Sequence, residues 1–333
     1  MSGLINKLIS EAKQQPKNIA IPEATDRDTL VLARRIVDEG MGTPFLIGER
    51  AQIEEAAQDA GVSLEGMRFE DVADESARFE VVDRYLQEPR MISLKGCRRR
   101  SKDPLNYAMM LEAVGDVDCT FAGHVATTGE VLMAAQNFIG LKDGVDTPSI
   151  MAIVEVEGFD GPEGDTIVFA DCGLNPEPDA EALASIAIAT ADQAEAVLGW
   201  DPRVAFLSFS TKGSGTSAST ETIEAALKVA RERRSDLKID GEFQLDAAIV
   251  PRVAERKVKA PSDVAGKANV LIFPDLDAAN IAIKTVQLFA HGNGYGHTLS
   301  GFNKPVSDSS RNSSVEEMLG DIAMLVLAAS RSK

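Results

Sequence analysis

The segment Thr166-Ile-Val-Phe-Ala170 decides the fold class when it is taken together with the residues that follow it. It is an unbroken apolar run of strand-forming residues, which is typical of a parallel strand buried on both faces. After a turn-rich connector, residues 180–198 carry a long helical pattern. A buried strand followed by such a helix predicts one unit of an α/β fold.

The same alternation continues in both directions along the chain. Further strands are expected at 18–21, 45–47, 119–122, 149–156, 204–209, 247–250 and 270–273, and further helices at 28–39, 129–138, 221–232, 278–290 and 315–329. The connector 157–165 is too short to hold a crossover helix, so strands 149–156 and 166–170 are expected to form a hairpin. We therefore expect an α/β fold with parallel and mixed sheets.

Composition excludes several classes of protein. The 333 residues include 34 basic and 52 acidic side chains, a formal net charge of −18, which disfavours nucleic acid and anionic membranes as partners. The longest apolar run, 322–329, is far shorter than the roughly 20 residues of a membrane-spanning helix. Three scattered cysteines make no disulfide framework, and His124, His291 and His297 make no metal motif. We expect a cytoplasmic protein without a metal site.

Small polar residues and two basic ones, between Gly301 and Glu317, run directly into the last predicted helix. Free N–H groups at that helix start, with Ser310 and Arg311 just before them, would make an anion pocket. The alternative is a helix cap, because Ser314 and Glu317 have capping-box spacing, as do Ser313 and Glu316 one register earlier. The two interpretations are compatible for different residues.

A second candidate is the loop Ser208–Gly215, at the end of the strand expected at 204–209. Its residues Thr211, Lys212 and Ser214 lie beside glycines, and such a loop can bring backbone N–H groups close to a phosphate. The spacing of a P-loop is absent, and a solvated connector is the alternative.

A third candidate is the basic segment Lys95–Lys102, with five positive charges in eight residues. Its arginines Arg98, Arg99 and Arg100 suit the phosphates of a nucleotide-like ligand. A solvated turn is the alternative. Two other polar stretches favour structural roles, since Asp171 is expected to form a turn and either Asp275 or Asp277 to begin a helix.

Five ordered blocks together resemble the phosphotransacetylase family, the phosphate acetyl and butyryl transferases. The blocks are Phe169–Asp171, Leu207–Ser214, Ile239–Ala248, Val264–Leu276 and Asn303–Arg311. The resemblance covers most of the chain. It is densest from Phe169 to Glu317 and looser before about Gly115.

The resemblance implies a two-domain enzyme of isocitrate/isopropylmalate dehydrogenase-like architecture, usually a homodimer. Residues 1–148 and 299–333 would form domain I, residues 149–298 domain II, and the active site would lie in the cleft between them. The implied reaction moves an acyl group, here acetyl, between phosphate and coenzyme A, as in acetate metabolism. Coenzyme A is a substrate, and no metal or redox cofactor is needed. The alternatives are a butyryl or other acyl-chain variant, and a catalytically weak homologue that binds coenzyme A or an acyl phosphate.

The resemblance also implies roles for residues. Ser310 would donate a hydrogen bond to the oxyanion, Arg311 would hold the phosphate or carbonyl oxygen, and Glu317 stands where the family carries a general-base Asp. Further substrate contacts are expected from Thr211, Lys212, Ser214, Asn303, Lys304, Arg98, Arg99 and Arg100.

Two positions depart from the family pattern, because Met133 and Leu288 stand where an arginine is usual. Each lost charge-assisted contact is worth about 1.5–3 kcal/mol. Either Arg98–Arg100 supply the missing charge, or the substrate differs, or activity is weak. A nicotinamide-dependent decarboxylating dehydrogenase is a rival with the same fold, but it needs an aspartate cluster for a divalent metal, and none stands out.

Overall fold

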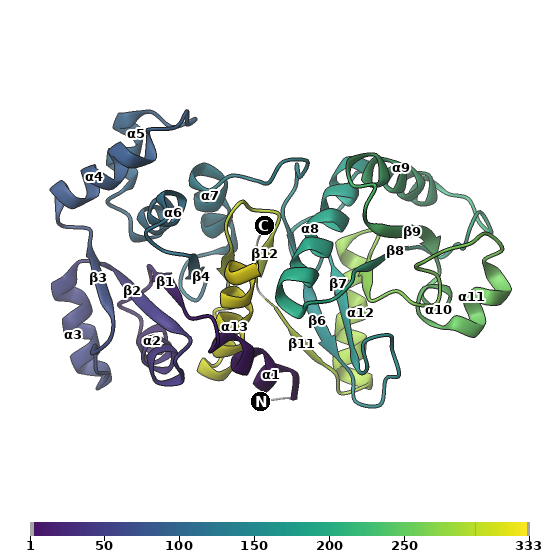
Figure 1. Ribbon diagram of the computed structural model, residues 1–333, viewed down its shortest axis with the longest axis horizontal. Coiled ribbons are helices and arrows are strands. Elements are labelled where there is room, and N and C mark those ends of the chain that lie inside the picture. The colour runs from purple at the N-terminus through teal and green to yellow at the C-terminus, as the bar shows by residue number, and fades with distance from the viewer. Residues whose placement is uncertain (1–2, 297, 332–333) are drawn as a thin grey trace. The chain divides into compact units, whose positions relative to one another are not determined.

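The computed structural model describes residues 3–296 and 298–331 (Figure 1). His297, one of the three histidines considered above, lies outside the described residues. The chain divides into two compact units: unit 1 comprises 1–140 and 302–333, and unit 2 comprises 141–301. The unit bounds therefore fall at 140 and 301, whereas the predicted domain boundaries lie at 148 and 298.

Unit 1 is built on five parallel strands in the order β3-β2-β1-β4-β13. The strands are β1 (Lys17–Ile21), β2 (Gly42–Gly48), β3 (Arg68–Asp71), β4 (Cys119–Ala122) and β13 (Val306–Asp308). The helices are α1 (Gly3–Ala12), α2 (Arg27–Glu39), α3 (Arg50–Ala60), α4 (Glu75–Tyr85), α5 (Leu94–Arg100), α6 (Pro104–Val114), α7 (Thr128–Phe138) and α13 (Val315–Arg331). Helices α1, α2 and α13 pack together on one side of the strands, and α6 packs with α7 on the other (Figure 1).

Local sequence explains where these helices begin and end, as α6 illustrates. Pro104 occupies its first turn, and the side chain of Asp103 accepts a hydrogen bond from the backbone N–H of Asn106. Gly115 ends the helix in the left-handed conformation, with φ 85°. Proline near the start and glycine just past the end are the arrangement that the backbone geometry of a helix favours.

A fully buried carboxyl lies in the core of unit 1. Glu112 on α6 is 0% exposed, and its Oε2 accepts a hydrogen bond of 2.6 Å from the Thr120 hydroxyl of β4. Its Oε1 has no hydrogen-bond partner in the part of the chain that the structure describes. Burial raises the pKa of Glu112 well above its ordinary value. The core therefore favours the protonated, neutral form of this side chain.

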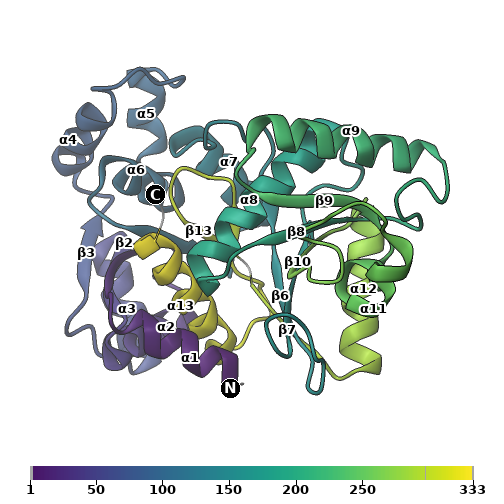
Figure 2. The ribbon, with the colours of Figure 1, turned by 45° about the vertical axis from the view of Figure 1, so that its right-hand side comes forward.

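Unit 2 contains a six-stranded mixed sheet in the order β11-β6-β7-β10-β8-β9. Its strands are β6 (Ala152–Glu155), β7 (Thr166–Ala170), β8 (Arg203–Leu207), β9 (Lys238–Phe243), β10 (Val270–Ile272) and β11 (Asn293–Tyr295). Two short strands, β5 (Ser149–Ile150) and β12 (Thr298–Ser300), pair antiparallel. The helices are α8 (Ala180–Leu198), α9 (Ala218–Arg233), α10 (Leu245–Ile249), α11 (Pro251–Lys257) and α12 (Leu276–Phe289). Helices α8 and α9 lie side by side (Figure 2). The predicted hairpin is confirmed, because β6 and β7 pair antiparallel.

Two of the strand predictions for unit 2 are wrong. Residues 247–250 were expected to form a strand, but α10 covers Leu245–Ile249 and α11 begins at Pro251. A short apolar run fits a buried helix as well as a strand, and Ala247 and Ala248 are buried here from a helix. The single strand expected at 149–156 is divided into β5 and β6. Among the described helices, none is both long enough and apolar enough to cross a membrane.

Candidate active site

Polar side chains gather at one edge of the unit 1 sheet. Strands β1, β4 and β13 are parallel neighbours, so their carboxyl ends meet at the same edge, where parallel α/β sheets carry their binding residues. Glu23 follows β1, residues 123–127 follow β4, and Ser310 and Arg311 follow β13. The predicted catalytic residues therefore lie where this architecture places functional groups.

Ser310 is held by contacts to its backbone. Its carbonyl oxygen accepts a hydrogen bond of 3.0 Å from the Ser313 N–H and lies 3.2 Å from Nδ1 of the His124 ring. Its hydroxyl accepts a 3.3 Å bond from the Asn312 N–H. The hydroxyl proton is not used in that bond, so it remains available to a substrate oxygen.

Glu317 forms the capping box of α13. Its Oε2 accepts hydrogen bonds from the N–H of Ser314, at 2.8 Å, and from the Ser314 hydroxyl, at 2.9 Å. The hydroxyl in turn accepts a 3.3 Å bond from the Glu317 N–H. The alternative register is not used, because Glu316 instead forms a 3.6 Å ion pair with Arg35. The exposed Glu317 carboxylate is thus fixed through one oxygen, and Oε1 makes no hydrogen bond within the described chain.

Arg311 is exposed, and its guanidinium makes no hydrogen bond or ion pair with any residue that the structure describes. Its charge acts on Glu130, which lies in the first turn of α7. Hydrogen bonds from the backbone and hydroxyl of Thr127 lower the pKa of Glu130, and the charge of Arg311 lowers it further. Arg311 therefore has donors free for an anionic ligand.

A cavity of about 620 Å³ opens in unit 1 beside this edge. Its apolar wall consists of Pro22, Pro104, Leu105, Val125, Ala126, Met133 and Ala134. Three acids also line it, but all three bind backbone N–H groups: Glu23, Asp103 and Glu130. Among the described lining residues the one base is Arg100, so the cavity combines an apolar wall with a single cation.

The three predicted arginines differ in what they contact. Arg98 lies 3.5 Å from Asp83 and stacks over the ring of Phe79, with its guanidinium carbon 4.3 Å from the ring centroid. Arg99 is exposed and does not line the cavity. Arg100 lines it and has no hydrogen-bond or ion-pair partner for its guanidinium among the described residues. The segment forms helix α5, with its arginines in the last turn, rather than the solvated turn that was the alternative.

Asn303 and Lys304 precede β13, and both are exposed. The Asn303 amide donates a 3.3 Å hydrogen bond to the carbonyl of Ile139, and its N–H donates to the carbonyl of Gly140. Lys304 makes no ion pair within the described ranges 3–296 and 298–331. Of these two residues, only Lys304 is charged, and its ammonium is exposed.

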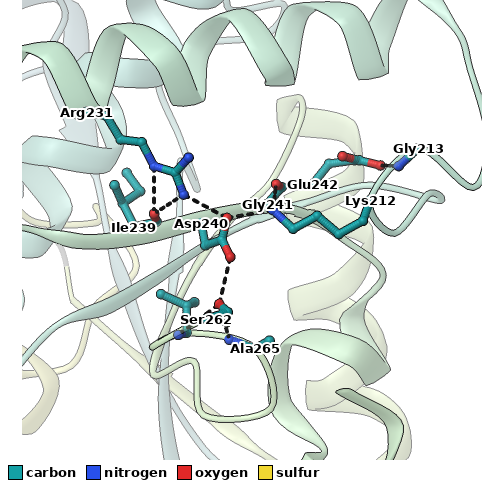
Figure 3. A network of polar contacts seen from close by, with 10 residues as sticks. Lys212, Gly213, Arg231, Ile239, Asp240, Gly241, Glu242, Ser262 and Ala265 are labelled. Carbon is teal, nitrogen blue, oxygen red and sulfur yellow. Dashed lines mark hydrogen bonds and ion pairs between the residues drawn. The ribbon is translucent and has the colours of Figure 1, made fainter. Parts of the chain in front are cut away.

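The loop Ser208–Gly215 belongs to unit 2, where residues of β9 hold it (Figure 3). The Lys212 ammonium binds Asp240, at 2.6 Å, and the carbonyl of Gly241. Burial raises the pKa of Asp240, but hydrogen bonds from Lys212 and Ser262 outweigh it, so the pKa is lowered overall. Lys212 would have to leave Asp240 before it could bind a substrate phosphate.

The hydroxyls of the same loop also have internal partners. Ser214 Oγ accepts a 2.9 Å bond from the Thr211 N–H, and Thr211 Oγ1 accepts a 3.0 Å bond from the Gln244 N–H. The buried Glu242 carboxylate accepts from the Ser210 hydroxyl and the Gly213 N–H. These bonds give the loop a defined shape.

The minor candidates have structural roles. The buried Asp171 accepts hydrogen bonds from the N–H groups of Gly173, Leu174 and Asn175, as expected of a turn-forming aspartate. Of the two aspartates expected to begin this helix, Asp275 caps α12 and Asp277 lies in its first turn. Within the described part of the chain, no three His, Cys, Asp or Glu side chains are grouped as metal ligands.

Two residues of the site were not singled out from the sequence. Glu23 binds the loop after β4 through three backbone N–H groups, and His124 contacts Ser310. Glu23 stands at the carboxyl end of a predicted strand, and that position alone was a usable signal. The contact of His124 with a residue 186 positions later leaves no local signal.

Comparisons with known proteins point to one family. The model of the family described as phosphate acetyl/butaryl transferase matches residues 3–326. A phosphate acetyltransferase of Acetivibrio thermocellus is 38% identical over 333 residues, which cover 98% of each chain. The chain is also similar to a phosphate acetyltransferase of Thermoanaerobacterium thermosaccharolyticum, with 37% identity, 98% coverage of this chain and 99% of that one.

Solved structures agree on the fold. The phosphotransacetylase EutD from Staphylococcus aureus superposes with a TM-score of 0.87 at 30% identity, covering 98% of this chain and 99% of its own. A 4-hydroxythreonine-4-phosphate dehydrogenase from Burkholderia phymatum superposes with a TM-score of 0.54 at 13% identity, covering 94% of this chain and 98% of its own. At this identity the likeness is one of fold alone. The predicted α/β class with dehydrogenase-like architecture is therefore confirmed.

Proposed function

The chain belongs to the phosphate acetyl/butaryl transferase family, and from this premise we propose that it transfers an acetyl group between phosphate and coenzyme A. The reaction is acetyl-CoA plus phosphate in equilibrium with coenzyme A plus acetyl phosphate. One observation carries the proposal within the site. Ser310 and the unpaired Arg311 precede α13, the Glu317 carboxylate lies in the first turn of this helix, and Arg100 is the one base among the described residues that line the cavity at this edge of the sheet.

In the direction of thioester synthesis, Glu317 takes the proton of the coenzyme A thiol. The thiolate attacks the acyl carbon of acetyl phosphate, and the carbonyl oxygen becomes an oxyanion that the Ser310 hydroxyl and Arg311 stabilise. The bond from carbon to the phosphate oxygen then breaks, and phosphate leaves with the electron pair. A thiol with pKa near 8.5 is only a few per cent ionised at pH 7, so a base is needed.

The capping box supports the role proposed for Glu317. Ser314 holds Oε2, which fixes the orientation of the carboxylate and leaves Oε1 to accept the thiol proton. A general base must be held in position to act, because a misplacement of about 1 Å can cost on the order of 10²-fold in rate. In this proposal the cap and the base are the same carboxylate.

We place coenzyme A in the unit 1 cavity. The molecule carries phosphates and a long, largely apolar pantetheine arm. The Arg100 guanidinium suits a phosphate, and the wall with Val125 and Met133 suits the arm. Arginine binds phosphate with two parallel hydrogen bonds, which makes it a strong single anchor. Arg100 thus takes the place of the family arginine that is absent at Met133.

Replacing Arg100 by alanine is expected to raise the KM for coenzyme A by roughly 10–100-fold, the effect of losing a charged hydrogen bond worth about 1.5–3 kcal/mol. The value of kcat should change little, because the contact is made equally in the ground state and the transition state. Initial rates at varied coenzyme A measure this. Arg99→Ala is the matched control, since it removes the same charge outside the cavity. Equal KM values for coenzyme A in both variants would show that Arg100 does not bind coenzyme A.

The acyl-group preference of the protein can be assayed directly. We expect acetyl phosphate to have the highest kcat/KM in a panel from acetyl to butyryl phosphate, followed by thioester absorbance. A maximum at butyryl phosphate would identify the butyryl variant. Binding by calorimetry without turnover on any member would identify the catalytically weak homologue and reject the proposed function.

We further propose a cytoplasmic homodimer that needs no metal or redox cofactor. Three large apolar side chains project from α12: Ile281 is 65% exposed, Leu288 73% and Phe289 83%. A cluster of this kind marks an interaction surface. Asp277 and Lys284 on α12 have opposite charges, so the helix itself has no net charge. Contact through α12 therefore brings little local repulsion, although each chain has a net charge of −18.

Light scattering tests the dimer. The native protein should have about twice the mass of the 35.6 kDa chain. Phe289→Asp should shift it to the monomer, because a desolvated carboxylate would be buried in the interface. Ala225→Asp, on the exposed face of α9, adds the same charge and should leave the mass unchanged. A native monomer would refute the proposal.

A further inference from the structure

We propose that Glu23 is a positioning residue of the acyl-transfer site, which acts on Ser310 through the loop after β4 and through His124. The inference rests on the proposed function and concerns a carboxylate to which that function gives no role. It depends on three contacts that succeed one another within unit 1.

The first contact joins Glu23 to the backbone of residues 123–126. Glu23 Oε1 accepts hydrogen bonds from the N–H groups of Gly123, at 3.0 Å, and Ala126, at 2.9 Å. Its Oε2 accepts from the His124 N–H, at 3.0 Å. Three converging backbone donors form the kind of concavity that binds anions in proteins, and here the anion is a side chain of the same fold. The carboxylate therefore fixes the conformation of this loop.

The second contact joins that loop to the segment of Ser310. Gly123 has φ +96°, and a Cβ built on it would lie 2.4 Å from Oδ1 of Asp308 and 2.7 Å from the N of Ser309. The Ser309 N–H also donates a 2.8 Å hydrogen bond to the carbonyl of Ala122. The two segments thus pack closely at Gly123, with no room for a side chain on this residue, so a shift of one segment displaces the other.

The third contact is made by the His124 side chain, which is only 9% exposed. Its Nδ1 lies 3.2 Å from the carbonyl oxygen of Ser310, and because a carbonyl can only accept, Nδ1 carries the proton. Its Nε2 lies 3.8 Å from Oδ1 of Asp26, the residue that caps α2. The ring is braced between the start of α2 and the residue proposed to bind the oxyanion.

This chain of contacts predicts an effect on the rate rather than on binding. Glu23 lines the cavity, but its oxygens are occupied by backbone donors, so it offers little to a ligand. What it controls is the position of Ser310. We therefore expect Glu23→Gln to lower kcat by about 10–100-fold, the cost of a misplacement of roughly 1 Å, with KM values nearly unchanged.

A double-mutant cycle on the full-length protein tests this route. We expect His124→Gln to lower kcat by a similar factor. The kcat of the double variant should lie within about twofold of the lower of the two single-variant values, since the effects of residues that act through one contact are not additive. A merely structural role would lower the melting temperature without this coupling. Asp74→Asn is the control, because Asp74 also accepts a backbone N–H, from Ala77 at the start of α4. It should preserve kcat, and because asparagine caps a helix about as well as aspartate, the melting temperature should change little.

The outcomes separate the two proposals. An active wild-type enzyme whose single-variant losses multiply in the double variant overturns the route through His124 and leaves the proposed function intact. A wild-type protein without turnover on any acyl phosphate overturns both. If Glu23→Gln does not fold, His124→Gln decides alone, and an unchanged kcat in that variant rejects the inference.

Discussion

Glu317→Gln is expected to lower kcat by about 10²–10⁴-fold, the usual contribution of a positioned general base. Glutamine keeps the shape of the side chain, and its amide oxygen can still accept the two hydrogen bonds from Ser314. The cap is therefore retained, whereas the ability to take the thiol proton is lost. Single-turnover formation of acetyl-coenzyme A measures the chemical step directly.

Ser314→Ala is the matched control for Glu317. It removes the hydroxyl of the capping box and should cost about 1 kcal/mol of stability, visible as a lower melting temperature. The Ser314 N–H still holds Oε2 of Glu317 in place, so kcat should remain within a few-fold of wild type. If Glu317→Gln retains wild-type kcat, the carboxylate is only a cap and another group must be the base.

The second large effect is expected at Ser310. Ser310→Ala should lower kcat by about 10²–10³-fold, because one donor to the developing oxyanion is lost. The backbone contacts of Ser310 to Ser313 and His124 do not involve its hydroxyl. The hydroxyl accepts one exposed 3.3 Å bond from the Asn312 N–H, which water can replace, so the variant should fold with nearly unchanged stability. KM should change less than kcat, since the bond strengthens only as the oxyanion forms.

Ser313→Ala provides the comparison, because it removes a buried hydroxyl from the same short segment. Its kcat should equal that of the wild type. Equal losses in Ser310→Ala and Ser313→Ala would indicate a general disturbance of the segment before α13. That result would contradict a specific role for Ser310.

The fold was predictable where apolar residues alone decide an element. Residues 119–122, 166–170 and 180–198 fold as expected, because burial on both faces leaves a continuous apolar signal. β9 escaped prediction because Asp240 and Glu242 interrupt its apolar pattern. Asp240 is tolerated in that strand through Lys212, 28 residues earlier in the chain, and a local pattern cannot reveal such a partner.

The candidate site was predictable to a similar extent. The position of Ser310 and Arg311 before a helix indicated an anion site, and the Ser314–Glu317 spacing indicated a cap. The difference between Arg98 and Arg100 was not predictable, because it depends on which face of α5 meets Phe79 and which meets the cavity. The role of Glu23 depends on a loop 100 residues away.

The Glu112 carboxyl makes folding of this chain a proton-uptake reaction. In the unfolded chain the group would titrate near pH 4.3, whereas in the folded core its pKa lies well above the ordinary value. Between these two values the folded state holds a proton that the unfolded state has released, so the free energy of unfolding falls as the pH rises. Unit 1 therefore loses part of its stability as the pH rises through the interval between these two pKa values.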